Sequence, residues 1–182
     1  MAIIRKAVEQ DAAAIARIYI ESWRSTYPGL LPDKLLLDMS SQDHEARWWR
    51  AMIARGRGRL FYAVAEDDTQ GVVGFGSAGP SRDPRLKYAG EVYTLYLRDE
   101  FHGTGLGRRL FVSLSERCAM AHGSTLVVWV LKGNPARYFY EALGGKYVAR
   151  RPTRLGGADI EELAFAWEDV SELIALGRSG RA

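Results

Sequence analysis

The stretch from residue 91 to residue 122 constrains the fold most strongly, because it joins an apolar strand to a helix through closely spaced glycines. Residues 91–99, EVYTLYLRD, form a nearly continuous apolar run, which is typical of a strand covered on both faces. FHGTGLGRRL follows at residues 101–110, with glycines at alternate positions. From Leu106 onward, apolar side chains recur every fourth residue as far as Cys118, which predicts a helix with one buried face.

The glycine loop between that strand and that helix has the features of an anion-binding site. Glycines allow positive φ angles and let a ligand approach the backbone closely. The free N–H groups at the start of a helix point outward, and the helix dipole adds positive charge there. Arg108 and Arg109 follow the loop and add further positive charge. The loop is therefore a candidate phosphate site.

Several interpretations of the loop compete on sequence alone. A P-loop requires a lysine after its last glycine, and none follows here. A dinucleotide-binding loop requires G-x-G-x-x-G and an acidic residue about 20 positions later. In this chain Arg108 occupies the place of the third glycine, and VVWVLKG at 127–133 contains no acid. The remaining alternative is a turn that only links strand to helix.

The rest of the chain alternates between strand and helix patterns. Apolar periodicity predicts further helices that start near residues 11, 42 and 134. Period-two patterns bounded by turn residues predict further strands at 2–8, 59–66, 72–79, 125–132, 146–152 and 160–168. A mixed sheet with helices on both faces would bury all of these elements. We therefore expect an α/β (α+β) fold with one domain over residues 1–182.

Two segments, in this order, resemble the signature of a known enzyme family. LYLRDEFHGTGLGRRL at 95–110 is followed by NPARYFYEALGG at 134–145. Together they resemble the GCN5-related N-acetyltransferase family, the acetyl-CoA-dependent GNAT enzymes. That family places Arg or Gln, two residues, Gly, one residue, and Gly or Ala after its central strand. In this chain His102 stands at the Arg or Gln position, and Gly105 and Gly107 match the small residues.

The resemblance implies both a fold and an activity. The fold would be a mixed, mostly antiparallel sheet with helices on both faces, splayed where the strands at 91–99 and 125–132 diverge. The activity would be transfer of an acetyl group from acetyl-CoA to a primary amine, by direct attack on the thioester and without a metal. The acceptor would be a small molecule or a peptide. A GNAT-like domain that binds acyl-CoA as a sensor, without turnover, is the alternative.

The resemblance also implies which residues bind the cofactor. The pyrophosphate of coenzyme A would rest on the backbone of His102, Gly103, Gly105, Leu106, Gly107 and Arg108. The pantetheine arm would run beside Leu95 and Leu97 like an added strand, with a backbone N–H near Leu97 facing the acetyl carbonyl. Asn134 would contact the pantetheine, although an asparagine before a helix also caps that helix without any ligand.

Tyr140 matches the family's tyrosine beside the leaving sulfur. A phenol with a pKa of about 10 gives up its proton less readily than a thiol with a pKa of about 8.5. We therefore expect Tyr140 to donate a hydrogen bond to the sulfur rather than to transfer its proton. The alternative is a helix tyrosine that packs against the core beside Phe139.

Glu91 is the candidate general base for the attacking amine. Alternation along a strand predicts that Glu91 shares a face with Tyr93, Leu95 and Leu97, which would point it toward the acceptor. The alternative is an exposed carboxylate where the strand begins.

The acceptor site carries no signature of its own in the sequence. The family's early helices usually shape that site, and the residues at this place are Trp23, Arg24 and Tyr27. We expect these residues to bind the acceptor, with core packing as the alternative for aromatic side chains on a helix.

The composition argues against several other classes of function. The single cysteine, Cys118, excludes an internal disulfide and a cysteine-rich zinc site, and the three histidines lack metal-ligand spacing. The net charge of +3 comes from scattered basic residues, so we expect no nucleic acid partner. No apolar run approaches the roughly 20 residues that span a membrane, and no signal peptide is evident, so we expect a cytoplasmic protein without membrane contact. A homodimer is compatible with the sequence.

Overall fold

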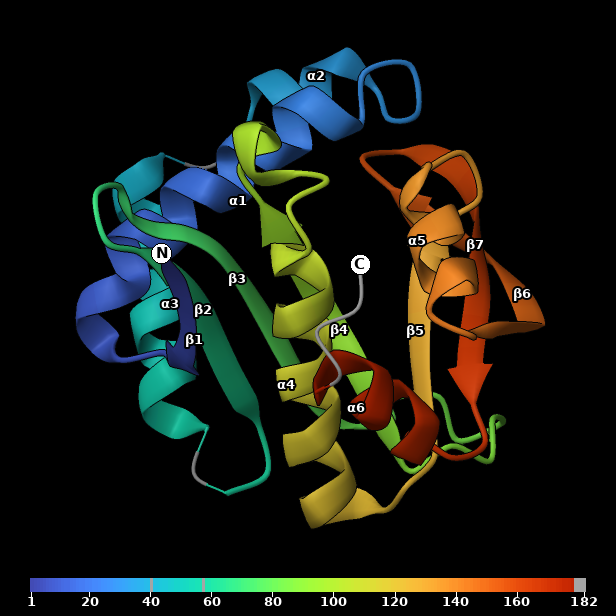
Figure 1. Ribbon diagram of the computed structural model, residues 1–182. Coiled ribbons are helices and arrows are strands. Elements are labelled where there is room, and N and C mark those ends of the chain that lie inside the picture. Colours follow the sequence, from blue (N-terminus) through green and yellow to red (C-terminus); the bar gives the residue numbers. More distant parts are fainter. Residues whose placement is uncertain (40, 57, 179–182) are drawn as a thin grey trace.

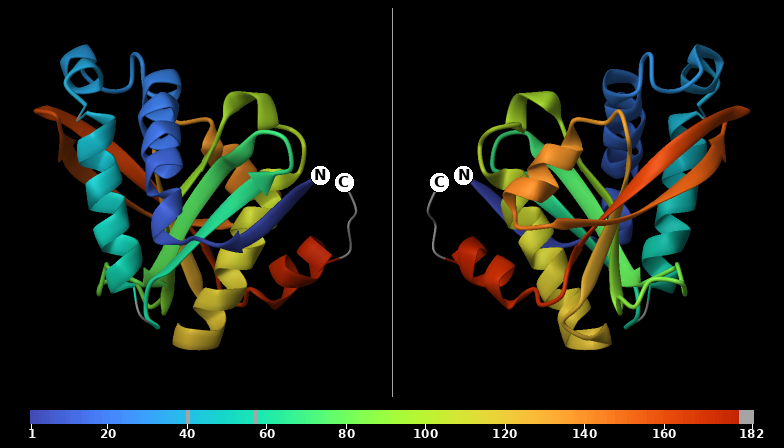
Figure 2. Two further views of the ribbon diagram at one scale, coloured as in Figure 1. Left: turned by 90° about the vertical axis from the view of Figure 1, so that its left-hand side faces the viewer. Right: turned by 90° about the vertical axis from the view of Figure 1, so that its right-hand side faces the viewer.

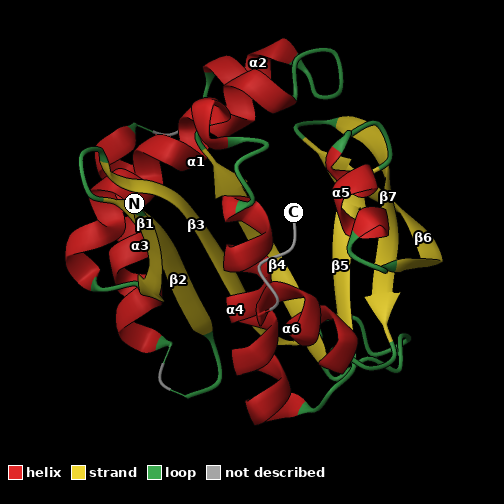
Figure 3. Cartoon of the chain, viewed as in Figure 1, coloured by secondary structure: helices red, strands yellow, loops and turns green. Residues whose placement is uncertain are grey.

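The structure is a computed structural model that describes residues 1–39, 41–56 and 58–178, so the predicted domain end at residue 182 lies outside it. The described strands form one sheet in the order β1-β2-β3-β4-β5-β7-β6 (Figures 1 and 3). The strands are β1 (Ala2–Lys6), β2 (Phe61–Asp67), β3 (Gly71–Pro80), β4 (Gly90–Leu97), β5 (Leu126–Leu131), β6 (Lys146–Leu155) and β7 (Ala158–Trp167). The helices are α1 (Ala12–Thr26), α2 (Asp33–Leu37), α3 (Gln42–Arg55), α4 (Leu106–His122), α5 (Ala136–Ala142) and α6 (Ser171–Arg178).

The sheet divides between β4 and β5. Neighbouring strands run antiparallel except for this pair, which runs parallel and is joined only from Gly90↔Leu126 to Val92↔Val128. Beyond Val92, β4 continues to Leu97 against β3, and Figure 1 shows the two strands moving apart. The prediction of a mixed, mostly antiparallel sheet splayed at its central strands is confirmed.

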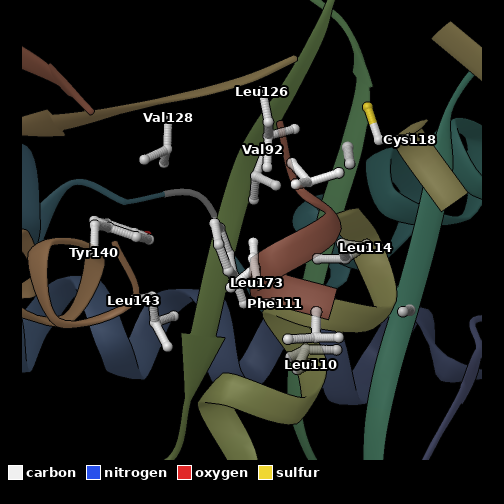
Figure 4. Packing of buried hydrophobic residues seen from close by; sticks show 14 of the residues in the cluster. Val92, Leu110, Phe111, Leu114, Cys118, Leu126, Val128, Tyr140, Leu143 and Leu173 are labelled. Atoms are coloured by element: carbon white, nitrogen blue, oxygen red, sulfur yellow. The ribbon is translucent and has the colours of Figure 1, made fainter. Parts of the chain in front are cut away.

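Helices cover both faces of the sheet, as predicted (Figure 2). α1 and α3 lie on one face, where Ile15, Ile18 and Trp49 pack with Val64 and Phe75 of the sheet. α4, α5 and α6 lie on the other face, over a larger core (Figure 4) that includes Val92, Leu110, Phe111, Leu114, Val128, Tyr140 and Leu173. Each fully buried apolar side chain of this size contributes about 1.5–3 kcal/mol. These two cores hold the sheet between its helices.

Two glycines of β3 bring neighbouring elements close together. A Cβ atom at Gly76 would lie 2.5 Å from Leu114 Cδ1 on α4, and a Cβ atom at Gly74 would lie 2.8 Å from Leu97 Cγ on β4. Larger residues at these positions would therefore push α4 and the Leu97 side chain away from β3. The glycines allow α4 to lie directly against the sheet behind the free end of β4.

A β-bulge interrupts β4 where it parts from β5. Ser77 pairs with Thr94 and Ala78 pairs with Val92, so Tyr93 is an extra residue opposite β3. The bulge reverses the alternation of side chains along β4. Val92 and Leu97 therefore pack in the same core cluster, although an odd number of positions separates them.

The segment from residue 27 to residue 36, which we call the bridging segment, connects the two halves of the sheet. Its Tyr27, Leu31 and Leu36 form a small core with Leu155 and Ile160 of the β6–β7 hairpin. This segment includes the start of α2, and Figure 1 shows it above the gap between β4 and β5. The two halves are thus joined by strand pairs at one end of the gap and by this small core at the other.

Candidate active site

Two neighbouring cavities meet where β4 and β5 diverge. The larger, of about 910 Å³, lies between the glycine loop, the free end of β4 and α5. The smaller, of about 270 Å³, lies between α1, β4, β5 and α5. Leu95 and Ala136 line both cavities. We call them the glycine cavity and the aromatic cavity, and together they form one cleft at the splayed strands.

The glycine loop forms a wall of the glycine cavity. Gly103 and Gly105 have φ angles of 73° and 79°, a left-handed conformation that residues with a Cβ atom rarely adopt. A Cβ atom there would meet nothing within 4 Å, so the conformation rather than the space requires glycine. The side chain of Leu106 is buried, so this residue offers its backbone to the loop. The predicted cofactor residues that line the cavity are Leu95, Leu97, His102, Gly103, Gly105, Gly107 and Arg108.

The first turn of α4 presents backbone donors at the same place. The helix begins at Leu106, and the first N–H groups of a helix have no acceptor within it. The N–H groups of Leu106 and Gly107 precede the Arg109 N–H, which bonds back to the Gly105 oxygen at 3.1 Å. The donors before it, together with the helix dipole, favour an anion at this end of the cavity.

The free end of β4 supplies a second binding element. From Thr94 to Leu97 this strand pairs with β3 on one side, and no described strand pairs with its β5 side. An extended ligand can hydrogen-bond to such an edge as another strand would. Leu95 and Leu97 lie on this part of β4 and line the glycine cavity.

Aromatic side chains form a large part of the lining of the aromatic cavity. They come from α1, the residue after it, β4, β5 and α5, and they are Tyr19, Trp23, Tyr27, Tyr93, Tyr96, Trp129 and Tyr140. Trp23 Nε1 donates a hydrogen bond to the Tyr96 hydroxyl at 3.0 Å, and Asn134 Nδ2 donates one to the Tyr27 hydroxyl at 3.5 Å. These bonds hold the rings in place around a space that both polar and apolar groups line.

Tyr140 lines the aromatic cavity from α5. Its ring packs against Phe111 with a centroid distance of 5.5 Å, and 6% of the residue is exposed. Burial raises the pKa of the Tyr140 phenol, and the nearby Tyr27 raises it further. The hydroxyl therefore keeps its proton at neutral pH and can act as a hydrogen-bond donor.

Asn134 makes two contacts with its carboxamide group. Its Oδ1 accepts a hydrogen bond from the N–H of Ala136, the first residue of α5, at 2.8 Å, although the N-cap position belongs to Pro135 and not, as predicted, to Asn134. Its Nδ2 bonds to the Tyr27 hydroxyl, and the residue lines the aromatic cavity. Contact between Asn134 and pantetheine stays a prediction.

Glu91 lies away from the cleft, and its predicted position is corrected here. It is 1% exposed, and its carboxylate accepts hydrogen bonds from the Arg82 backbone N–H at 2.8 Å and from Arg82 Nε at 3.0 Å. It lines neither cavity. The predicted alternation is wrong because the bulge at Tyr93 puts Glu91 and Leu95 on opposite faces of β4. Glu91 thus fastens the loop after β3 to β4.

The structure brings two of the three predicted acceptor residues to the cleft. Trp23 and Tyr27 line the aromatic cavity, with ring centroids 5.0 Å apart. Arg24 is directed elsewhere, because its Nε donates a hydrogen bond to the Leu36 backbone oxygen at 3.2 Å. Arg24 therefore attaches α1 to α2 and does not line the aromatic cavity.

Known proteins share both the sequence and the fold of this chain. Residues 85–153 match the model of a family described as FR47-like protein. Over 177 residues the chain is 33% identical to YuaI of Bacillus subtilis (strain 168), an uncharacterised N-acetyltransferase. The aligned region covers 97% of this chain and 98% of that protein. The chain belongs to the GCN5-related N-acetyltransferase (GNAT) family.

Solved structures extend this GNAT assignment to the arrangement of the elements. YncA from Salmonella typhimurium, solved with acetyl-CoA, has a TM-score of 0.68 at 23% identity and covers 92% of this chain and 93% of its own. PaiA N-acetyltransferase from Thermoplasma acidophilum, solved with coenzyme A, has a TM-score of 0.69 at 16% identity and covers 92% and 99%. At these identities the likeness concerns the fold.

The described residues contain neither a cluster of metal ligands nor a membrane-spanning helix. No group of three or more His, Cys, Asp or Glu side chains in residues 1–39, 41–56 and 58–178 could hold a metal ion. None of the helices in that part of the GNAT chain is long and apolar enough to cross a membrane.

Several residues of this GNAT cleft were missed by the sequence interpretation. Tyr19, Tyr96, Trp129 and Glu162 line the aromatic cavity, and each lies in an element that the sequence predicts. The one available signal was the pair Glu161 and Glu162, which stands directly before the apolar run LAFAW. The aromatic residues carry no signal of their own, because rings on helices and strands usually pack in the core.

Proposed function

We propose that this GNAT protein transfers the acetyl group of acetyl-CoA to a primary amine. The observation that carries the proposal is the meeting of two unlike cavities at Leu95 and Ala136. One cavity has backbone donors suited to a phosphate, and the other has aromatic rings, hydroxyl groups and a carboxylate suited to a second molecule. The solved relatives that hold acetyl-CoA and coenzyme A support the choice of a thioester for the first cavity.

In this proposal the glycine cavity holds the coenzyme A part of the substrate. The left-handed Gly103 and Gly105 and the first turn of α4 bind the pyrophosphate through backbone N–H groups. The pantetheine lies along the free edge of β4, beside Leu95 and Leu97. Because the backbone supplies the donors, histidine at position 102 is compatible with this role.

The chemistry requires a new C–N bond and the loss of a C–S bond. Acetyl-CoA supplies the acetyl group in activated form, as a thioester. The amine nitrogen bonds to the carbonyl carbon, the sulfur leaves, and the amine gives up one proton while the sulfur gains one. A backbone N–H near Leu97 stabilises the negative charge that grows on the carbonyl oxygen. Tyr140 donates a hydrogen bond to the leaving sulfur, because its buried phenol keeps its proton.

Thermal unfolding with different nucleotides tests the first half of the proposal. We expect acetyl-CoA to raise the melting temperature, and NAD and ATP at the same concentration to leave it unchanged. A ligand at 100 times its dissociation constant stabilises a protein by about 2.7 kcal/mol, which is readily measured. Stabilisation by NAD or ATP alone would contradict the proposal.

Release of free thiol from acetyl-CoA tests the second half. The assay compares a panel of primary amines and short peptides, and mass spectrometry identifies the acetylated product. We expect thiol release that depends on the amine. Binding of acetyl-CoA without release by any member of the panel would favour the acyl-CoA sensor instead.

A further inference from the structure

The aromatic cavity contains a single charged side chain. Among the described residues that line it, Glu162 of β7 is the one ionisable acid, and no lysine, arginine or histidine is part of the lining. The other polar groups of the lining are uncharged: they belong to Thr94, to Asn134 and to the tyrosine and tryptophan side chains. A carboxylate surrounded by aromatic faces attracts a cation and repels an anion. The cavity is thus suited to a positively charged group.

The Glu162 carboxylate is held in place by the neighbouring strand. Arg151 is its cross-strand partner on β6, and Arg151 Nε donates a hydrogen bond to Glu162 Oε2 at 2.7 Å. The Arg151 guanidinium also lies over the Trp129 ring, 3.9 Å from its centroid. Within residues 1–39, 41–56 and 58–178, no hydrogen bond reaches Glu162 Oε1. One oxygen is therefore anchored and the other is available to a ligand.

The charge of Glu162 acts on the opposite wall of the cavity. Burial raises the pKa of the Tyr27 phenol, and the negative charge of Glu162 raises it further. Tyr27 follows the end of α1 and Glu162 lies on β7, and both line the aromatic cavity. A cation bound between them would therefore contact the carboxylate on one side and the rings of Trp23 and Tyr27 on the other.

The size and the charge of the cavity limit what else the acceptor can carry. Its volume of about 270 Å³ lies near the lower end for ligand pockets, which measure roughly 300–1,000 Å³. A carboxylate on the acceptor would need a positive partner, and Arg151 is already bonded to Glu162 and lies 3.7 Å from Asp83 Oδ2. An amino acid would thus place an anion in a cavity whose one charge is negative.

We propose that the acceptor is a small primary amine with an apolar, ring-sized body and no carboxylate, and that Glu162 binds its ammonium group. The inference rests on the proposed function for the reaction itself, but it concerns which amine is bound. Glu162 is a positioning residue in this scheme. It holds the amine in the aromatic cavity, which Tyr140 also lines, and the ammonium gives one proton to solvent water before its nitrogen attacks.

Three matched ligands test the predicted preference. 2-Phenylethylamine and phenylalanine differ only by the carboxylate, and phenylalaninamide keeps the added bulk without the negative charge. We expect kcat/KM for 2-phenylethylamine and phenylalaninamide to exceed that for phenylalanine by at least about tenfold. Tryptophan fluorescence measures binding without turnover, because Trp23 and Trp129 line the aromatic cavity.

Glu162→Gln tests the residue, and Glu161→Gln is its matched control. Glu161 is the next residue on β7, is bonded to Lys132 at 2.8 Å and lines neither cavity. We expect Glu162→Gln to raise KM for 2-phenylethylamine by at least about tenfold, with KM for acetyl-CoA unchanged as a check of folding. Glu161→Gln should keep both KM values within about twofold.

Each contrary result has a distinct meaning. Equal or better use of phenylalanine overturns the inference and leaves the acetyltransferase proposal intact, as does an unchanged amine KM in Glu162→Gln. Rejection of phenylalaninamide together with phenylalanine also overturns it, because bulk rather than charge would then decide. Selective fluorescence changes without thiol release from any amine would support the binding preference and contradict the proposed function.

Discussion

The glycine cavity and the aromatic cavity adjoin, yet they are built from different parts of the chain. The glycine cavity depends on backbone geometry, namely the left-handed Gly103 and Gly105 and the first turn of α4. The aromatic cavity depends on side chains from α1, β4, β5, α5 and β7. A site made by the backbone needs contiguous residues and leaves a motif in the sequence, whereas a site made by side chains can be spread over the whole chain.

This contrast predicts that changes in one cavity alter one ligand. Replacements in the glycine loop should alter acetyl-CoA binding, and replacements in the aromatic cavity should alter the use of the amine. Replacement of Tyr140, which lines the aromatic cavity from α5, should alter the rate.

The largest effect is expected at the glycine loop. Gly105→Val should weaken acetyl-CoA binding by about 100-fold. A β-branched residue in the left-handed conformation costs about 1–3 kcal/mol of strain, and its side chain would enter the phosphate site of the glycine loop. Gly71→Val is the control, since Gly71 also has a positive φ of 70° and open space around it, in the β2–β3 turn. Calorimetric titration with acetyl-CoA compares the two variants. Equal losses of affinity in the two variants would show that general destabilisation, and not damage to the glycine loop, weakens acetyl-CoA binding.

The next effect is expected at Tyr140 in the aromatic cavity. Tyr140→Phe should lower kcat by about 30-fold, because a hydrogen bond to a charged leaving group is worth about 1.5–3 kcal/mol. KM for acetyl-CoA should change little. Tyr138→Phe is the control on the same helix, since Tyr138 is 57% exposed and lines neither cavity.

The pH profile of the same variant sharpens this test. Burial raises the pKa of Tyr140 above its usual value of about 10, so the phenol stays neutral through the alkaline assay range. Wild type and Tyr140→Phe should therefore share the same alkaline limb of kcat. An alkaline limb that disappears in the variant would mean that Tyr140 itself titrates in that range.

The smallest kinetic effect is expected at Glu91. Glu91→Gln should leave kcat within about twofold, because the carboxylate is bonded to Arg82 outside both cavities. The variant should lose about 1–2 kcal/mol of unfolding free energy in urea, since a charged hydrogen-bonded group is replaced by a neutral one. A large fall in kcat in a folded variant would restore the general-base role.

The sequence predicted those features that contiguous residues determine. The strand at 91–99, the glycine loop and the helix from Leu106 were predictable because apolar periodicity and glycine conformation are local properties. The splay between β4 and β5 followed from the family resemblance. These features fixed the position of the proposed cofactor site.

The remaining errors arise from properties that are not local. Tyr93 forms a bulge because of its pairing with β3, and nothing in the sequence marks it, so alternation placed Glu91 on the wrong face. Arg24 was directed to the Leu36 oxygen by the path of the bridging segment. The pairing of Glu162 with Arg151 depends on the register of β6 and β7, which the sequence alone does not determine.

Because the ladder between β4 and β5 is short, a ligand bound in the gap would have a structural role. Three residue pairs, from Gly90 to Val92 on β4, join the two halves of the sheet between β4 and β5. An extended molecule in the gap would form the hydrogen bonds that β4 and β5 do not form with each other there. Its binding would complete the sheet, and its release would leave the two halves less firmly connected.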